Sequence, residues 1–319
     1  MLNFAITAEN HFMNTNYLLN IVGPTAIGKT SLAIKLANKF NTEIISADSR
    51  QFYKEMSIGT AVPSKEELRA AKHHFIQHIS IEDNYNVGDF ETEAIQKLNE
   101  LFQHKNFAIM VGGSGLYTKS VLQGLDYFPE VSLEIRQELN LKLEKEGLAP
   151  LQHQLQKLDP HYFKIVDIEN PHRVIRALEV CISSGKPYSS YLNQPKKKRD
   201  FTTISIGLDA DRKIIYDRIN HRVDLMMEEG LLQEARSLFP KRQLNALNTV
   251  GYKELFSFLE GKDSLETAIS EIKKNTRRFA KRQLTWFRKD QEINWFDNQT
   301  PIEEIQQFIE TKISDRSHS

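Results

Sequence analysis

The segment Gly23–Thr30 has the residue types and the spacing that hold phosphate groups. It reads Gly-Pro-Thr-Ala-Ile-Gly-Lys-Thr and fits the pattern G-x-x-x-x-G-K-[ST]. Glycines let backbone N–H groups converge on an anion at a helix N-terminus, where the helix dipole also favours negative charge. Lys29 is expected to reach the outer phosphates, and the Thr30 hydroxyl to hold Mg²⁺. The loop indicates a diphosphate or triphosphate, with these candidate binding residues: Gly23, Pro24, Thr25, Ala26, Ile27, Gly28, Lys29 and Thr30.

A carboxylate occupies a second position that suits chemistry. Asp48 directly follows the apolar run 42–47. A carboxylate at the carboxyl end of a strand, beside a phosphate loop, can act as a general base. Aspartate is also common in turns and as a helix cap. The position alone therefore leaves both roles open, base and cap.

Basic residues are concentrated near the C-terminus. Segment 273–289 contains no helix breaker, and one face of the helix that it predicts is basic, with Lys274, Arg277, Arg278, Lys281 and Arg288. The other face is expected to pack through Phe279, Ala280, Gln283, Leu284 and Phe287. Such a helix can guide a phosphate backbone, or it can be a solvated helix without a partner.

Two further groups of residues have a possible role. Arg218 and Arg222 share one helical face and suit a diphosphate, although pairing with nearby acidic residues is an equal alternative. His73, His74 and His78 lack a carboxylate or another ligand motif, which favours surface or structural histidines over a zinc site.

The elements that must position these residues follow an alternating pattern. Strand-like apolar runs alternate with helical patterns, at 17–22, 42–47, 107–111, 203–208 and 293–296. This order predicts a parallel sheet, whose ligands gather at the carboxyl ends of the strands. Gly112-Gly113-Ser114-Gly115 lies at such an end, with no acidic residue there for Mg²⁺ and no guanine-reading N-K-x-D motif elsewhere. A motor or switch NTPase is therefore disfavoured.

The stretch between the third and fourth of these runs is helical throughout. Ser132 is expected to cap a helix that ends at Glu146, and Asn170 with Pro171 predicts a second helix start. We expect an α/β fold: a P-loop parallel sheet with flanking helices and an all-helical insertion domain. The expected divisions are an N-terminal extension, the core in two pieces and the insertion, namely 1–16, 17–123 with 200–319, and 124–199.

The composition limits the class of protein. The 319 residues hold 42 basic and 42 acidic side chains, so any nucleic-acid footprint must be local. The one cysteine, Cys181, excludes an internal disulfide framework and is expected in the core. We find no run of membrane-spanning length and no secretory signal, and we expect a cytoplasmic monomer with no membrane partner.

Six motifs in order resemble one family, the tRNA dimethylallyltransferases, also called tRNA isopentenyltransferases, of the bacterial type without a zinc finger. The first is the phosphate loop, which looks like G-P-T-x-x-G-K-T. The others are Asp48-Ser49-Arg50-Gln51-Phe52-Tyr53 with Ile58-Gly59-Thr60-Ala61, Gly112–Tyr117, Asn170–Val180 with Ser184-Gly185-Lys186-Pro187, Val250-Gly251-Tyr252-Lys253-Glu254, and Lys281–Arg288. Ser114 replaces the usual threonine, and His172 stands where glutamine or arginine is more usual.

The resemblance implies transfer of a dimethylallyl group from dimethylallyl diphosphate to the N6 amine of the adenosine just 3′ of the anticodon. It implies Mg²⁺ as cofactor, Asp48 as base, and Thr25, Ser114 and Arg222 at the reacting site. The anticodon stem-loop of tRNA is the implied partner. Its implied contacts are Asp48, Ser49, Arg50, Gln51, Ser114, His172, Arg173, Arg176, Gly251, Tyr252, Lys253, Lys281, Arg282, Gln283, Trp286 and Arg288.

Two other functions remain as alternatives. An ATP-dependent kinase of a small metabolite would share the loop, the sheet and Asp48, but it leaves the helical insertion and the basic helix unexplained. A non-catalytic RNA-binding module is disfavoured because Lys29, Thr30 and Asp48 are all present.

Overall fold

A computed structural model describes residues 15–195 and 198–317. The predicted extension 1–16 lies almost wholly outside the described residues. The chain divides into two compact units, one formed by residues up to Gln123 together with those from Arg199, the other by Gly124–Lys198. Each unit has its own hydrophobic core, and each is described here by itself.

The larger unit is built on a parallel sheet, which confirms the predicted fold class. Its six strands have the order β3-β2-β4-β1-β5-β6, and every neighbouring pair is parallel. The strands are β1 (Tyr17–Val22), β2 (Ile44–Ser46), β3 (His73–His74), β4 (Phe107–Val111), β5 (Thr202–Asp209) and β6 (Ile293–Asp297). The two-residue strand β3 had no sequence signal, because a strand so short has no alternating pattern.

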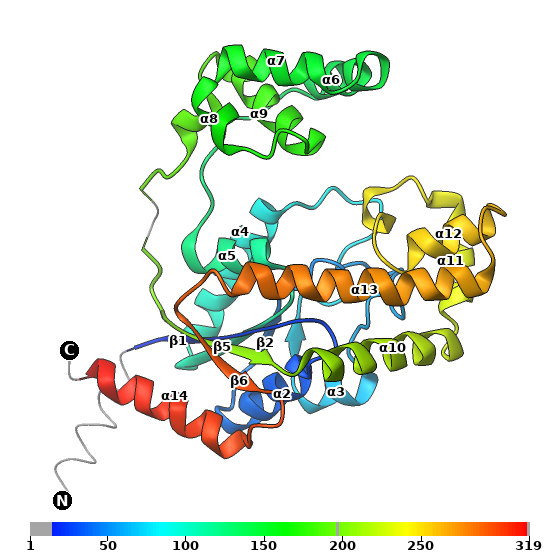
Figure 1. Ribbon diagram of the computed structural model, residues 1–319. Helices are drawn as coiled ribbons and strands as arrows, with labels where there is room; N and C mark the ends of the chain where they lie inside the picture. Colours follow the sequence, from blue (N-terminus) through cyan, green and yellow to red (C-terminus); the bar gives the residue numbers. More distant parts are fainter. Residues whose placement is uncertain (1–14, 196–197, 318–319) are drawn as a thin grey trace, which may run out of the picture. The chain divides into compact units, whose positions relative to one another are not determined.

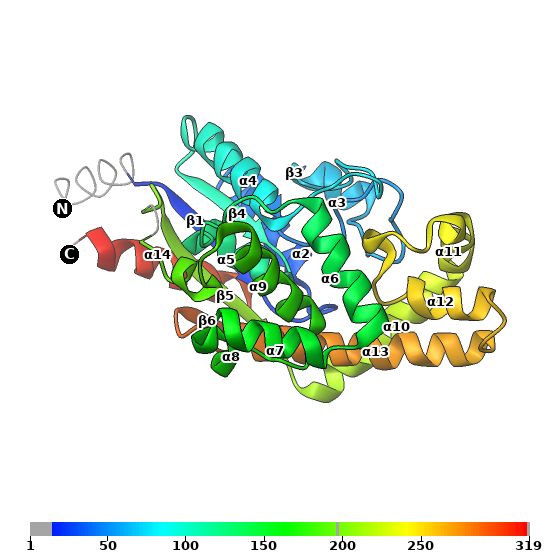
Figure 2. The same ribbon diagram turned by 90° about the horizontal axis from the view of Figure 1, so that it is seen from above.

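Helices cover both faces of this sheet (Figure 1). Buried residues of α2 and α14 pack against one face, and buried residues of α4 and α5 pack against the other. The helices of this unit are α2 (Lys29–Lys39), α3 (Lys65–Ala70), α4 (Val87–Phe102), α5 (Gly115–Gln123), α10 (Arg212–Glu228), α11 (Leu231–Leu238), α12 (Tyr252–Leu259), α13 (Leu265–Phe287) and α14 (Ile302–Ser317). Figure 2 shows the long helix α13 running beside α10 and α12.

The smaller unit is helical throughout its described residues. It holds α6 (Leu133–Glu146), α7 (Ala149–Leu158), α8 (Pro160–Ile165), α9 (Pro171–Ser184) and a 3₁₀ turn at Tyr188–Tyr191. The predicted ends of α6 are confirmed: Ser132 accepts a hydrogen bond from the Ile135 amide, and Gly147 follows the last turn. Cys181 is buried, as predicted.

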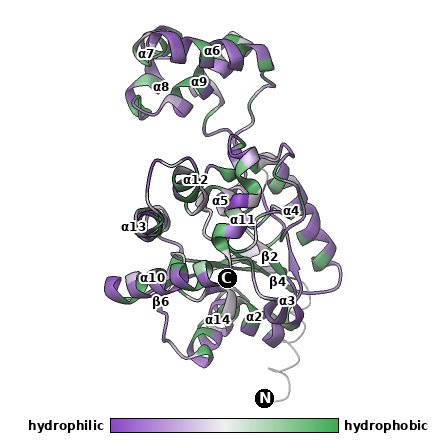
Figure 3. Ribbon diagram, turned by 90° about the vertical axis from the view of Figure 1, so that its right-hand side faces the viewer, coloured by the Kyte–Doolittle hydropathy of each residue, from purple (hydrophilic) through white to green (hydrophobic). Residues whose placement is uncertain are grey.

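Each helix carries both hydrophobic and hydrophilic residues along its length, as Figure 3 shows. This pattern is typical of helices that cover a core with one face. No helix within the described ranges is long and apolar enough to cross a membrane.

One packing prediction for α13 is wrong. Ala280, Gln283 and Phe287 are buried, but Phe279 is 39% exposed. Its position lies at the edge of the buried face, where the Arg282 guanidinium stands over the ring at 5.7 Å. A cation on an aromatic face lets a half-exposed ring remain in water.

Candidate functional site

The phosphate loop Gly23–Thr30 connects β1 to α2 at the carboxyl edge of the sheet. Gly23 requires the absence of a side chain, because a Cβ there would lie 2.5 Å from the Leu208 carbonyl oxygen. Gly28 caps α2 with a φ of 106°, and Ala26 has a φ of 64°. These backbone conformations bend the loop so that its N–H groups can converge on an anion.

The Lys29 ammonium is held inside this loop. It donates a hydrogen bond to the Pro24 carbonyl oxygen at 2.7 Å. Burial lowers the pKa of Lys29 to about 8, although the Asp48 carboxylate opposes that shift and Arg222 adds to it. A partly desolvated ammonium whose charge is only partly balanced will attract the oxygens of a diphosphate.

Asp48 follows β2 at the same edge, and its contacts are compatible with both roles that the sequence left open. Its Oδ1 accepts a hydrogen bond from the Arg50 amide at 3.2 Å, which is a turn-capping contact. Its Oδ2 receives no hydrogen bond from any residue that the structure describes. Burial raises the pKa of Asp48, against the lowering effects of the Arg50 amide, Lys29 and Arg222. A carboxylate with a raised pKa and one free oxygen can take a proton.

Two arginines of α10 flank the phosphate loop. Nη1 of Arg222 donates to the Thr25 hydroxyl at 3.4 Å, and burial lowers the pKa of Arg222, with the Arg218 charge as a smaller cause. Nη2 of Arg218 lies 3.8 Å from the position of a Cβ on Gly28. Neither arginine forms an ion pair with a described residue, so the internal pairing that was the alternative to a diphosphate contact is not seen among the described residues.

Ser114 lies where the segments after β2 and β4 meet. Its hydroxyl accepts a hydrogen bond from the Ser49 amide at 3.1 Å and lies 3.1 Å from the Ser49 hydroxyl. The Ala47 amide donates a hydrogen bond to the Val111 carbonyl oxygen at 2.7 Å, and the Gly112 amide donates one to the Ile21 carbonyl oxygen at 3.2 Å. Three strand ends are therefore held together around the candidate reacting site.

Arg50 and Gln51 have internal partners. Arg50 donates to the Ala246 carbonyl oxygen at 2.8 Å. Gln51 donates to the Ala61 carbonyl oxygen at 2.9 Å and accepts from the Ser46 hydroxyl at 3.3 Å. Both side chains, expected at the RNA, are in this structure the links between the Asp48 segment and neighbouring loops.

Glu234 was missed by the sequence reasoning, although it organises this region. Its carboxylate accepts hydrogen bonds from the amides of Ser57, Ile58 and Gly59, each at 2.9 Å, and from the Tyr252 hydroxyl at 2.6 Å. A Cβ on Gly59 would lie 2.7 Å from the Tyr252 ring, which explains why a glycine stands there. Tyr252 is fully buried in this arrangement.

The basic helix α13 divides into paired and unpaired cations. Ion pairs or hydrogen bonds hold Lys273 to Asp224, Lys274 to Glu271, Arg277 to Asn220 and Arg288 to Asp209. Within α13, three exposed cations have no ion pair to any described residue, namely Arg278, Lys281 and Arg282. Arg278 donates a hydrogen bond to the Asn275 side chain at 3.3 Å. Trp286 is 44% exposed, and a Cβ on Gly115 would lie 2.2 Å from its ring.

Gln283 is buried, as its place on the packing face of the predicted helix implied. Its Oε1 accepts a hydrogen bond from the Thr25 amide at 2.9 Å, and its Nε2 donates to the Gly113 carbonyl oxygen at 3.0 Å. The side chain is 5% exposed, so its amide has partners inside the protein on both ends.

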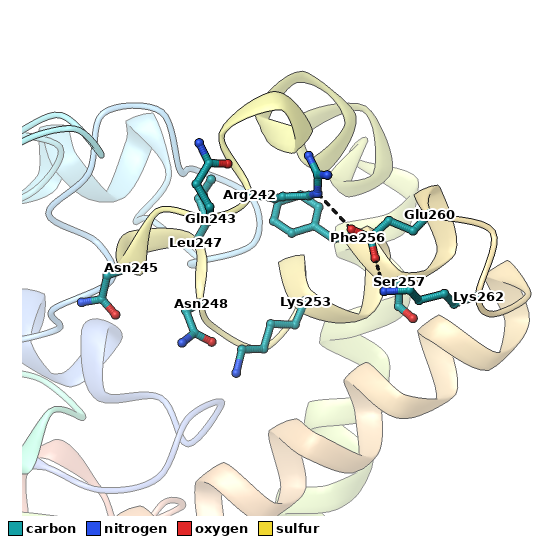
Figure 4. Close-up of a pocket in the computed structure, with 10 residues that line it drawn as sticks. All are labelled: Arg242, Gln243, Asn245, Leu247, Asn248, Lys253, Phe256, Ser257, Glu260 and Lys262. Carbon is teal, nitrogen blue, oxygen red and sulfur yellow. Dashed lines mark hydrogen bonds and ion pairs between the residues drawn. The ribbon is translucent and has the colours of Figure 1, made fainter. Parts of the chain in front are cut away.

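A pocket of about 510 Å³ lies beside the Val250–Glu254 motif. Figure 4 shows Asn248 and Lys253 on one side of it, and the cluster of Arg242, Glu260 and Lys262 on the other. Glu260 forms ion pairs with Arg242 at 2.9 Å and Lys262 at 2.6 Å. Lys253 has no such acidic partner within the described ranges, which leaves its charge available to an outside group.

The smaller unit places its three candidate residues on α9. His172 and Arg173 are exposed in the first turn, where Arg173 lies 3.8 Å from Asp167. Arg176 donates to Glu179 at 3.3 Å, and its guanidinium stands 5.6 Å from the centre of the Phe128 ring. The helix start is as predicted, because Asn170 accepts a hydrogen bond from the Arg173 amide.

The three histidines do not form a metal site. His73 and His74 form the two-residue strand β3, and His78 lies beyond it. His74 bonds to Glu43 at 2.7 Å, and His73 to the Ala71 carbonyl oxygen at 2.8 Å. Among the described residues, no group of three or more His, Cys, Asp or Glu could hold a metal ion.

Comparisons with known proteins point to one family. A family model described as IPP transferase matches residues 51–290. The tRNA dimethylallyltransferase of Christiangramia forsetii is 66% identical over 300 residues, which cover 94% of this chain and 99% of that protein. The tRNA dimethylallyltransferase 1 of Bacteroides fragilis is 46% identical, over 94% of this chain and all of its own length (100%).

Solved structures show the same likeness. The full-length tRNA isopentenylpyrophosphate transferase of Bacillus halodurans has a TM-score of 0.72 and 37% identity, over 95% of this chain and 99% of its own. A eukaryotic dimethylallyltransferase acting on tRNA has a TM-score of 0.77 and 27% identity, over 90% of this chain and 75% of its own. With the phosphate loop, the half-buried carboxylate of Asp48 and these matches together, the chain belongs to the IPP transferase family, that of the tRNA dimethylallyltransferases.

Proposed function

We propose that this protein transfers the dimethylallyl group of dimethylallyl diphosphate to the N6 amine of the adenosine immediately 3′ of the anticodon in tRNA, releasing diphosphate. The observation that carries the proposal is the pairing of a phosphate loop with the half-buried carboxylate of Asp48 at one edge of the sheet. A phosphate-binding loop and a proton acceptor are the two groups that this transfer needs.

The bond that breaks joins the allylic carbon to a diphosphate oxygen. Negative charge develops on the leaving diphosphate, and the cations of Lys29 and Arg222 stand where they can neutralise it. Arg218 adds a third positive charge at the start of α2. The electron pair of the broken bond leaves with the diphosphate, so the loop acts as a leaving-group site and needs no water-activating residue.

The bond that forms joins the allylic carbon to N6 of adenine. This exocyclic amine is a poor nucleophile, because its lone pair is delocalised into the ring. Asp48 accepts the N6 proton as the new bond forms, and its free Oδ2 is the atom for that role. The Thr25 hydroxyl, which accepts a hydrogen bond from Arg222 at 3.4 Å, is our candidate for a contact to the diphosphate or the reacting group.

The residues present fit a Mg²⁺ ion held mainly by the substrate. Mg²⁺ binds through one or two protein oxygens together with phosphate oxygens and waters. The Thr30 hydroxyl makes no hydrogen bond to a described residue and stands at the start of α2, so it would hold the ion there. When bound, Mg²⁺ supplies further charge neutralisation for the diphosphate.

The acceptor adenine must leave the stack of the anticodon loop to reach this site, and unpaired loop bases are extruded at low cost. The unpaired cations of α13, with Lys253 and the exposed His172 and Arg173 of the smaller unit, are our candidates for contacts to RNA phosphates. Because the acceptor is tRNA, we place the reaction in the cytoplasm.

Incubation of the protein with unmodified tRNA, Mg²⁺ and labelled dimethylallyl diphosphate tests the proposal. We expect label in N6-dimethylallyl adenosine after nucleoside analysis, and no requirement for ATP. Pyrophosphate with Mg²⁺ should raise the melting temperature, because it binds the folded state. Stoichiometric consumption of ATP with phosphorylation of a small acceptor would instead establish the kinase alternative.

A further inference from the structure

Helix α13 touches two loops of the candidate reacting site through one side chain. Gln283 bonds at once to the Thr25 amide of the phosphate loop and to the Gly113 carbonyl oxygen after β4. These partners are 258 and 170 residues away along the chain. The oxygen of its planar amide accepts one of these bonds and the nitrogen donates the other, so a shift of α13 would displace both loops.

The same stretch of α13 also presents charges to solvent. Lys281 and Arg282, the two residues before Gln283, are exposed and form no ion pair with any residue that the structure describes. One turn of helix therefore carries an outward cationic face and an inward amide. Successive side chains point about 100° apart on a helix, which makes this division possible.

The inward contact is closely fitted. A Cβ on Gly113 would lie 2.1 Å from Gln283 Nε2, so the amide occupies the space that a larger residue would fill. On the phosphate loop, the residue that Gln283 holds by its amide is the same Thr25 whose hydroxyl accepts from Arg222. The orientation of Thr25 therefore depends on one contact from α13 and one from α10.

We propose that Gln283 is a positioning residue that links α13 to the phosphate loop, so that RNA bound on α13 and diphosphate bound in the loop strengthen each other. This inference rests on the proposed function, in which α13 contacts tRNA. In this role Gln283 acts through the Thr25 amide and not through a contact with either substrate. RNA that fixes α13 also fixes the Thr25 amide, and the loop then loses less freedom when it binds diphosphate.

The test measures the affinity for pyrophosphate with Mg²⁺, in the absence and presence of a saturating anticodon stem-loop. For the unchanged protein we expect tighter pyrophosphate binding with RNA, by roughly fivefold or more. Gln283→Met keeps the side-chain volume but removes both hydrogen bonds. We expect it to abolish most of this enhancement and to raise KM for dimethylallyl diphosphate about tenfold, with RNA affinity alone unchanged within about twofold.

Two further variants keep the test decisive. Gly113→Ala displaces the Gln283 amide without changing Gln283, and it should reproduce the loss of enhancement even if Gln283→Met does not fold. Ile272→Val is the matched control, because Ile272 is buried on α13 in a different cluster. It should lower the melting temperature but keep the enhancement.

The possible failures are distinguishable. If Gln283→Met weakens RNA binding alone, Gln283 contacts RNA and the inference is wrong. If the unchanged protein prenylates tRNA but its affinity for pyrophosphate is the same with and without RNA, the inference is wrong and the proposed function stands. If the unchanged protein neither binds nor prenylates tRNA, both are overturned.

Discussion

The hydroxyl of Tyr252 donates a hydrogen bond of 2.6 Å to Oε1 of Glu234, and this carboxylate also holds three consecutive amides, those of Ser57, Ile58 and Gly59. Burial raises the pKa of Tyr252, and the Glu234 charge raises it further, so the phenol stays a donor. The loop 57–61 is in turn bonded to Gln51. Glu234 therefore supports the segment that carries Asp48 from a distance.

Glu234→Gln is expected to destabilise the protein by about 1–3 kcal/mol, because a neutral amide cannot satisfy the donors that the carboxylate now satisfies. Tyr252→Phe removes one of the four hydrogen bonds and should cost less, about 1 kcal/mol. Denaturant or thermal unfolding measures both. Glu228→Gln serves as the control, because Glu228 is an exposed residue of α10. An equal loss of unfolding free energy in all three variants would contradict the role of Glu234.

Asp48→Asn should lower turnover by roughly 10²-fold or more, the scale of general-base catalysis, with diphosphate binding largely kept. The base works only when ionised, so turnover of the unchanged enzyme rises with pH through the pKa of Asp48. Because burial raises the pKa of Asp48 above the ordinary 3.8, this rise lies above the pH at which an exposed aspartate titrates. Single-turnover rates against pH should show the rise, and Asp48→Asn should lose it. Near-normal turnover in a folded variant would leave Asp48 as a turn cap only.

Binding of the diphosphate should weaken as the pH rises above about 8, the pKa to which burial lowers Lys29. A bound diphosphate favours the charged ammonium and raises that pKa, so binding takes up a proton in this range. The ligand for this test is a non-reactive thio-analogue of dimethylallyl diphosphate. Its phosphate groups are fully ionised by about pH 7, so they do not titrate in the range that is measured. Titration calorimetry at several pH values measures the effect. Lys29→Met should bind weakly at every pH; a variant with the same pH dependence as the unchanged protein would exclude Lys29 as its cause.

Arg278→Ala and Lys281→Ala should each weaken tRNA binding and make it less dependent on salt. A lost phosphate contact lowers the slope of log affinity against log salt by about 0.7 to 0.9. Lys274→Ala is the matched control on the same helix, because Lys274 already pairs with Glu271 at 2.6 Å. Affinity for the small diphosphate should stay unchanged in all three. If the slope stays the same, these cations are solvated, and His172, Arg173 and Arg176 become the first residues to test.

The sequence alone determined the features that are local in the chain. The phosphate loop, the limits of β1 and β4, and the starts of α6 and α9 all depend on residues within a few positions of one another. Glycine, proline and capping side chains act on their own backbone, so their effect can be predicted from neighbours. The order of six motifs also indicated the family, since motif spacing is a property of the chain.

The tertiary structure decided which side chains are bonded within the protein and which are left exposed to solvent. Gln283 and Arg50 carry the residue types of RNA-binding groups, yet each is bonded to loops far away in sequence. Arg288 is paired with Asp209, and Phe279 is half exposed beneath Arg282. A helical pattern defines which residues share a face, but not what the rest of the chain places against that face. Partners brought together by folding, such as Glu234 and the amides of 57–59, leave no local signal, because the hydrogen bonds exist only once the chain has closed around them.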